Sequence, residues 1–168
     1  MDTPAAEVEI DEALITRLVE AQHPDLAGPV RIVASGWDNV VARLGDELAV
    51  RLPRRAMAAP LVEHEARWLP VLAPLLRVPI PAPVRVGHLT GDYPWTWVIT
   101  PWFEGVPVTA LPVQRRRQIA AELGAAQSPL HVCAAIEAPA NSVRGGPLAT
   151  REAMIREQAT QVERGDEL

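Results

Sequence analysis

The feature that most constrains the fold is a run of three short apolar segments, separated by turns of three or four residues, within residues 30–65. The turns are Gly36-Trp37-Asp38-Asn39 and Gly45-Asp46-Glu47. Turns this short connect neighbouring antiparallel strands as hairpins. The segments therefore predict a three-stranded meander with strands at 30–35, 40–44 and 48–53.

The rest of the chain predicts a helix on each side of this meander and a change of character near residue 103. Asp11 can cap a helix over about 12–22, and Pro60 suits the first turn of a helix over about 61–76. Pro70 lies inside that second helix, so we expect a kink or an early stop there. The Pro-rich run 78–83 must be extended, and it leads into two further strands. We expect these strands at 84–89 and 95–102.

Beyond residue 103 the strands give way to helices. A linker is followed by helices expected at 112–127 and 149–164. Strands first and helices last are typical of an α+β lobe joined to an all-helical one. We therefore expect two domains, an α+β lobe at 1–103 and a linker with an incomplete helical lobe at 104–168.

Composition excludes several kinds of protein. The net charge is −5, and the only basic run, at 115–117, has no interleaved aromatic residues, so we expect no nucleic-acid partner. No apolar run approaches the roughly 18 residues of a membrane span, and the N-terminus has no signal pattern. We therefore expect a cytoplasmic protein with no membrane partner. The single Cys133 and the scattered histidines show no metal-ligand spacing.

We expect one charged residue of the predicted strand and one of the predicted helix to form an ion pair. On strand 48–53, Ala49 and Arg51 face away from the apolar residues. On helix 61–76, Glu65 lies on or beside the apolar stripe. A carboxylate near a core face needs a cationic partner, because an unpaired buried charge is very costly. Such a pair positions nucleotide phosphates in kinases, but it is equally consistent with a simple ion pair between helix and sheet.

Two further features favour the nucleotide interpretation. The strand sequence LAVR at 48–51 has the shape of the V-A-I-K strand of kinases, with Arg in the place of Lys. The chain has no Lys, and all sixteen of its basic residues are Arg. The turn at 36–39 can offer backbone N–H groups to a phosphate, although Asp-Asn turns also occur in hairpins without a ligand.

Longer stretches of the chain resemble aminoglycoside phosphotransferase family proteins of an actinobacterial type. The similar stretches are GWDN at 36–39, RLGDELAVRLPRR at 43–55, VPIPAP at 78–83, YPWTWVITPWFEG at 93–105 and APANSVRGGPLATRE at 138–152. Proteins of this family have a protein-kinase-like fold and transfer the γ-phosphoryl group of a nucleoside triphosphate to a hydroxyl of a small molecule. The resemblance implies a five-stranded antiparallel sheet plus helix, followed by the first helices of a truncated helical C-lobe.

The resemblance also implies a role for individual residues toward ATP or GTP. Gly36, Trp37, Asp38 and Asn39 would form the nucleotide-covering turn. Val41 and Ala49 would contact the base, Arg51 would hold phosphates and Glu65 would orient Arg51. The hinge, whose backbone meets the base edge, would consist of Thr100, Pro101, Trp102 and Phe103.

The chain departs from the family pattern in two ways. Arg51 replaces a Lys, and a planar guanidinium is not equivalent to an ammonium group. Family members also have a later loop that begins His-Gly-Asp, followed by the Asn and Asp that hold Mg²⁺. Neither is present here: His131 is not followed by Gly-Asp, and the only Asp after Asp92 is Asp166. We therefore expect no catalytic and no metal-binding residues, although Mg²⁺ is expected for the full family protein.

The sequence as a whole predicts part of a phosphotransferase. Such an enzyme would move the γ-phosphoryl of ATP or GTP to a hydroxyl of an aminoglycoside-like or other small molecule. Without the catalytic loop we expect this chain to be inactive alone. A non-catalytic nucleotide-binding or interaction module, or a truncated gene product, remains an alternative.

Overall fold

The computed structural model describes residues 4–130, 135–139 and 148–165. The chain divides into two compact units, Met1–Val132 and Cys133–Leu168. His131 and Cys133, which were considered above, lie outside the described residues.

The first unit is built on a five-stranded sheet in the order β1-β2-β3-β5-β4. All four neighbouring pairs are antiparallel, so the predicted five-stranded antiparallel sheet is confirmed. The strands are β1 (Val30–Ser35), β2 (Asn39–Leu44), β3 (Leu48–Pro53), β4 (Arg85–Gly87) and β5 (Trp97–Pro101).

The last two strands are shorter than expected, and hydrogen bonds made outside the sheet explain where β4 ends. The backbone N–H of His88 donates to Gln22 Oε1 at 2.7 Å, and Thr90 N–H donates to the Tyr93 carbonyl at 2.7 Å in a turn. Because these groups are bonded elsewhere, the chain leaves the ladder after Gly87. Asn39 was placed in the turn by the sequence analysis, but it is the first residue of β2 and pairs with Pro53.

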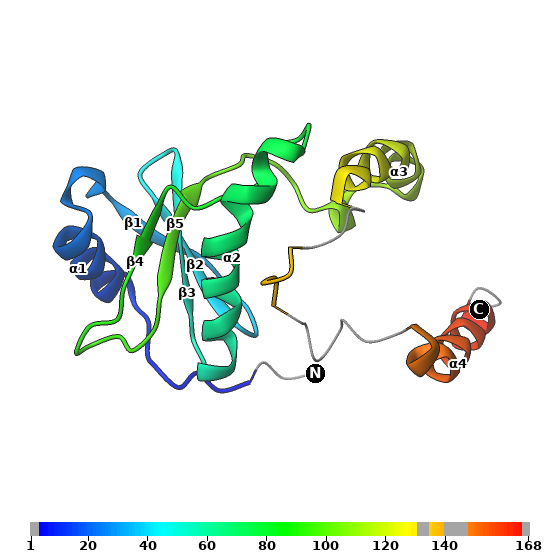
Figure 1. Ribbon diagram of the computed structural model, residues 1–168, viewed down its shortest axis with the longest axis horizontal. Helices are drawn as coiled ribbons and strands as arrows, with labels where there is room; N and C mark the ends of the chain where they lie inside the picture. The colour runs from blue at the N-terminus through cyan, green and yellow to red at the C-terminus, as the bar shows by residue number, and fades with distance from the viewer. Residues whose placement is uncertain (1–3, 131–134, 140–147, 166–168) are drawn as a thin grey trace. The chain divides into compact units, whose positions relative to one another are not determined.

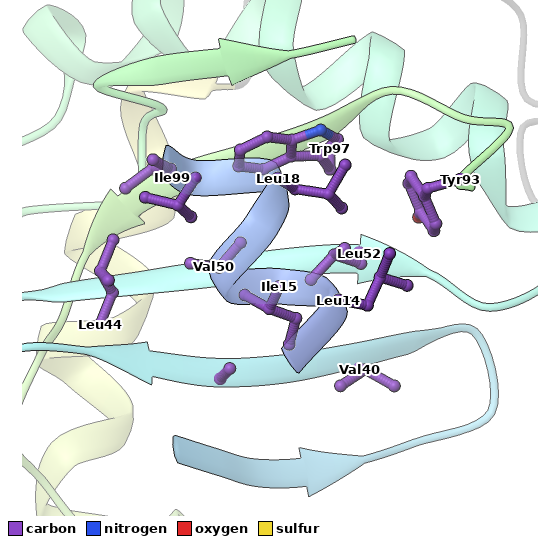
Figure 2. Close-up of a cluster of buried hydrophobic side chains, with 12 residues drawn as sticks. Leu14, Ile15, Leu18, Val40, Leu44, Val50, Leu52, Tyr93, Trp97 and Ile99 are labelled. Carbon is purple, nitrogen blue, oxygen red and sulfur yellow. The ribbon is translucent and has the colours of Figure 1, made fainter. Parts of the chain in front are cut away.

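One face of the sheet packs against α1 (Glu12–Gln22). The predicted cap is present, since the Asp11 carboxylate accepts from Leu14 N–H at 2.7 Å. Figure 2 shows the apolar side chains of α1 directed at those of the strands. The core cluster consists of Leu14, Ile15, Leu18, Val19, Val40, Ala42, Leu44, Val50, Leu52, Tyr93, Trp97 and Ile99. This cluster fixes which face of each strand is buried and leaves the alternate residues for the opposite face.

The opposite side of the sheet carries α2 (Ala59–Leu72), and Figure 1 shows the sheet between α1 and α2. Pro70 lies inside α2, and the helix ends two residues later. A short 3₁₀ turn, Ala73–Leu75, then continues the chain. The helix therefore passes through Pro70 and ends at Leu72, before the expected residue 76. Pro74, which has no N–H to donate to the helix, lies in the 3₁₀ turn that follows.

Two further helices follow. One is α3 (Val113–Gln127), which carries the exposed arginines at 115–117. The other is α4 (Glu152–Gly165), which begins after a 3₁₀ turn, Leu148–Arg151, so the helix starts three residues later than expected. None of the described helices is both long enough and apolar enough to span a membrane.

Candidate functional site

The face of the sheet that α1 leaves free gathers the residues predicted for ligand contact. In register, Val41 lies opposite Arg51, and Arg51 lies opposite Val98. Ala49 lies opposite Thr100 one step along the same face. Directly opposed residues of antiparallel strands point to one face. The alternation of β3 predicted from sequence is therefore what the sheet shows, with Val50 and Leu52 in the core.

A cavity of about 240 Å³ lies over this face. Every predicted site residue outside the turn lines it: Val41, Ala49, Arg51, Glu65, Thr100, Pro101, Trp102 and Phe103. Pro81, Pro83 and Val98 also line it, and the sequence analysis did not name them as site residues. Val98 had a usable signal, because it lies two residues before Thr100 on a strand and so shares its face. Pro81 and Pro83 had no such signal in the sequence, because their position depends on how the extended segment at 78–83 packs beside the sheet.

The charged part of the cavity wall is the predicted pair of Arg51 and Glu65. Arg51 Nη1 donates to Glu65 Oε2 at 2.6 Å, and the two side chains are 32% and 30% exposed. A guanidinium carries five N–H donors, and Glu65 is the only described residue that accepts from it. Arg51 therefore retains donors for a ligand, while Glu65 holds its orientation.

The turn at 36–39 does not line the cavity and is closed on itself. Gly36 N–H donates to the Asn39 carbonyl at 2.9 Å, and the Asp38 carboxylate pairs with Arg55 at 2.5 Å. The N–H groups of Trp37 and Asp38 have no acceptor within the described part of the chain. The indole of Trp37 is 48% exposed. Of the N–H groups of the turn, that of Gly36 is therefore used within the turn, while those of Trp37 and Asp38 remain available beyond the end of the cavity.

At the other end of the cavity, the predicted hinge is held by contacts that the sequence analysis missed. Trp102 N–H donates to the Glu47 carbonyl at 2.7 Å, so it is not free for a ligand, and Pro101 has no N–H. Phe103 N–H has no acceptor among the residues that the structure describes.

Arg43 contacts Trp102 of this hinge and Glu104, which follows the hinge. Its guanidinium lies 5.1 Å from the centre of the Trp102 ring and bonds Glu104 at 2.8 Å and the Asp46 carbonyl at 2.8 Å. Arg43 lies two residues after Val41 on β2, so strand alternation alone places it on the same face as the site. Its partners, however, could not be read from the sequence.

A five-stranded sheet, a helix ion-paired to its third strand and a cavity at the end of the fifth strand define the N-terminal lobe of a protein-kinase-like fold. The phosphotransferase enzyme family matches residues 29–167. Because this is most of the chain, the chain belongs to that family, and the recognition made from sequence motifs is confirmed. No curated protein sequence matches the chain.

Solved structures of aminoglycoside phosphotransferases share the fold. The GDP complex of wild-type aminoglycoside 2′-phosphotransferase-IIIa has a TM-score of 0.68 and 20% identity, over 80% of this chain and 48% of that one. The GDP and kanamycin complex of APH(2″)-IIia has a TM-score of 0.62 and 20% identity, over 72% and 42%. The streptomycin–ATP ternary complex of APH(2″)-IIa has a TM-score of 0.52 and 18% identity, over 76% and 42%. This chain therefore spans less than half the length of each of these three structures.

Proposed function

We propose that this chain provides the nucleotide-binding lobe of a phosphotransferase that moves the γ-phosphoryl of ATP or GTP to a hydroxyl of a small molecule. The observation that carries the proposal is the Arg51–Glu65 pair, at 2.6 Å, in the wall of an apolar cavity. Without a cavity beside it, a partly buried ion pair would only join the helix to the sheet. Next to a cavity, the same pair presents unused guanidinium donors to whatever the cavity binds.

The residues present fit a nucleoside triphosphate. Val41, Ala49 and Val98 offer apolar surface to the faces of a base. The Phe103 N–H, which has no acceptor among the described residues, can donate to the edge of the base. The cavity of about 240 Å³ is below the roughly 300–1,000 Å³ of most ligand sites. It therefore suits the base, with the phosphates extending along the strands toward Arg51. A guanidinium fork there can donate to two phosphate oxygens at once.

The described residues do not fit Mg²⁺. No three His, Cys, Asp or Glu side chains within 4–130, 135–139 and 148–165 are placed to hold a metal ion. We therefore assign no step to a metal in this chain. Phosphoryl transfer depends on positioning and on charge stabilisation by metal ions and by a residue that orients the acceptor hydroxyl. Because these 168 residues contain no His-Gly-Asp, we propose that the chain binds nucleotide without transferring phosphate.

Two measurements test the proposal on the 168-residue chain. Calorimetric titration with ATP and with GTP should give saturable binding, and the tighter ligand should raise the melting temperature. Incubation with γ-labelled ATP, Mg²⁺ and kanamycin, which is bound in one of the similar structures, should give no labelled product. Absence of binding by both nucleotides would reject the nucleotide site. Labelled product would reject inactivity while supporting the reaction class.

A further inference from the structure

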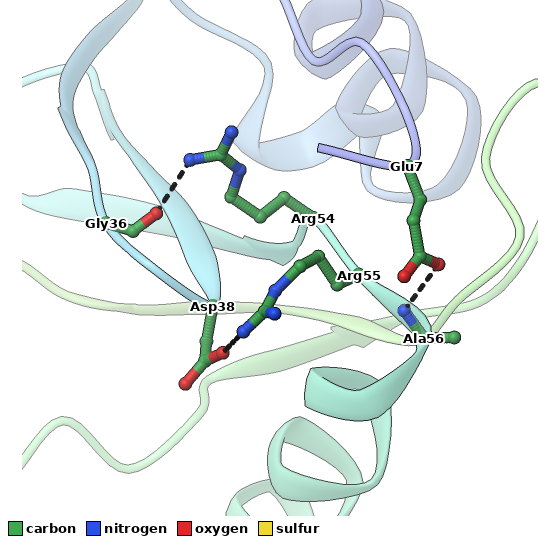
Figure 3. Close-up of polar contacts among 6 residues, drawn as sticks. All are labelled: Glu7, Gly36, Asp38, Arg54, Arg55 and Ala56. Atoms are coloured by element: carbon green, nitrogen blue, oxygen red, sulfur yellow. Dashed lines mark hydrogen bonds and ion pairs between the residues drawn. The ribbon is translucent and has the colours of Figure 1, made fainter. Parts of the chain in front are cut away.

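Two arginines that follow β3 reach back to the 36–39 turn. Arg55 Nη2 donates to Asp38 Oδ1 at 2.5 Å, and Arg54 Nη1 donates to the Gly36 carbonyl at 2.8 Å. Arg54 N–H also donates to the Asp38 carbonyl at 2.9 Å. Figure 3 shows both side chains directed at the turn. The neighbouring segment at 54–55 therefore holds the turn by hydrogen bonds to two of its residues, Gly36 and Asp38.

That neighbouring segment is itself anchored from the opposite direction. Glu7 N–H donates to the Arg54 carbonyl at 2.9 Å, and Ala56 N–H donates to Glu7 Oε2 at 2.9 Å. Figure 3 shows Glu7 on the far side of the segment from the turn. Because these hydrogen bonds hold the backbone at 54–56, the side chains of Arg54 and Arg55 contact the turn from an anchored segment.

The Asp38–Arg55 pair is more than a surface contact. The Arg55 side chain is 14% exposed and that of Asp38 is 42% exposed, so the pair is only partly screened by solvent. The Nε atoms of Arg54 and Arg55 are buried and have no partner among the described residues. Unsatisfied buried donors lower stability. The Asp38–Arg55 pair therefore joins a mostly buried cation to a half-exposed carboxylate of the turn.

The pair lies where the phosphates of a bound nucleotide would extend. Val41 is opposite Arg51, and Asn39 is opposite Pro53, so the turn lies just beyond the Arg51 end of the cavity. Asp38 is three residues from Val41, which is about 10 Å along an extended strand. A free carboxylate at this distance repels a triphosphate, and a mobile turn cannot present its N–H groups.

We propose that Arg55 is a positioning residue for triphosphate binding: through Asp38 it holds the 36–39 turn in place and neutralises the one negative charge in it. This inference rests on the proposed nucleotide function. It predicts that Arg55 matters for the phosphates and not for the base, and that it acts only while Asp38 is present.

The test is a double-mutant cycle on the full 168-residue chain, with calorimetric Kd values for the tighter of ATP and GTP and for its nucleoside. Arg55→Met should weaken triphosphate binding about tenfold and change nucleoside binding by less than about twofold, since charge-assisted contacts are the strong ones. Asp38→Asn, which loses the anchor but also the negative charge, should weaken triphosphate binding only about threefold. In the Asp38→Asn background, Arg55→Met should have almost no further effect. With Asp38 intact, Arg55→Lys should retain most of the wild-type affinity, because it keeps a cation opposite the carboxylate.

Arg85→Met is the matched control, because it removes an Arg–Asp pair of 3.1 Å with Asp25 that lies outside the cavity lining. It should leave both Kd values unchanged. Hydrogen exchange of the nucleotide-free protein should be faster at 36–39 in Arg55→Met and in Asp38→Asn. If Arg55→Met does not fold, the exchange and affinity of Asp38→Asn carry the test.

Any one of four results would overturn the inference. Equal weakening of triphosphate and nucleoside would show a merely structural role for Arg55. An undiminished effect of Arg55→Met in the Asp38→Asn background would show that Arg55 does not act through Asp38. Unchanged triphosphate binding in Arg55→Met, or unchanged exchange in Asp38→Asn, would reject the inference while the nucleotide site stands. A wild-type chain that binds neither ligand would instead reject the proposed function, and this inference with it.

Discussion

Arg51 of β3 and Glu65 of α2 meet at 2.6 Å, Nη1 to Oε2, on the wall of the cavity. The two residues are fourteen positions apart in the sequence, one on the strand and one on the helix. The pair therefore couples the orientation of α2 to the place where a phosphate would be held.

Arg51→Met should weaken binding of ATP and GTP by about 10–100-fold, because a charge-assisted hydrogen bond contributes about 1.5–3 kcal/mol. The free energy of unfolding should fall by only about 1 kcal/mol or less, since both side chains are about a third exposed and solvent screens the pair. Calorimetric titration and urea unfolding measure the two effects. Arg85→Met, which breaks an exposed pair with Asp25, is the control. Normal nucleotide binding by Arg51→Met would show that the pair only joins helix to sheet.

Arg43→Met should weaken nucleoside binding several-fold, because Arg43 holds Trp102 and Glu104 at the hinge. The stacking contact contributes about 0.5–1 kcal/mol, so the free energy of unfolding should fall by a similar amount. Kd values for adenosine and guanosine measure the effect on the base site. The ratio of triphosphate to nucleoside affinity should stay at its wild-type value. A change in that ratio would contradict a role confined to the hinge.

Gly87→Ala should destabilise the lobe by about 1–3 kcal/mol, the usual cost of overpacking a core. A Cβ at this position would overlap the indole of Trp97, which is fully buried and hydrogen-bonded to the His88 carbonyl. The midpoint of urea unfolding measures the loss. Gly91→Ala is the matched control, because nothing lies within 4 Å of a Cβ there. Equal midpoints for the two variants would contradict the close packing of Gly87 against Trp97.

Tyr93 should make the lobe less stable as pH rises above about 10, the ordinary pKa of tyrosine. Burial raises the pKa of its hydroxyl far above that value, and the hydroxyl donates to the Pro53 carbonyl at 2.7 Å. The unfolded chain therefore releases a proton that the folded chain retains, which favours unfolding at alkaline pH. Below about pH 10 the hydroxyl is protonated in both the folded and the unfolded chain, so the stability that this group contributes to the fold is fully present.

Tyr93 is the only tyrosine in the chain, so its ionisation can be followed alone by ultraviolet absorbance. Tyrosinate should form only together with alkaline unfolding. Tyr93→Phe should cost about 1–3 kcal/mol at neutral pH, because the Pro53 carbonyl loses its buried partner. The variant should also lose the part of the alkaline instability that comes from Tyr93. Tyrosinate formation near pH 10 in a folded protein would contradict this account.

The local pattern of the sequence was sufficient for the meander and for the alternation of β3. The two turns of residues 36–39 and 45–47 are too short for any connection except a hairpin. Strand alternation then placed Ala49 and Arg51 on one face, and helical periodicity placed Glu65 beside the apolar stripe. These inferences needed only the repeat of each element, and every predicted residue outside the turn lines one cavity.

The same reasoning failed for the surroundings of the 36–39 turn and of the hinge. Arg55 lies seventeen residues from Asp38, and Arg43 is far along the chain from Glu104. Nothing in the spacing of either pair signals the contact. Both follow from the register of β2 on β3 and from the insertion of β5 between β3 and β4.

The sequence by itself determined the hairpins, the face on which each strand residue lies and the motifs that place the chain in its family, because these depend on neighbours a few positions apart. The tertiary structure alone decided the order of the strands, the hydrogen bonds of Arg54 and Arg55 to the turn and the contacts of Arg43. These depend on which distant segments pack together. That choice is made by the burial of the whole apolar core, which no local spacing encodes.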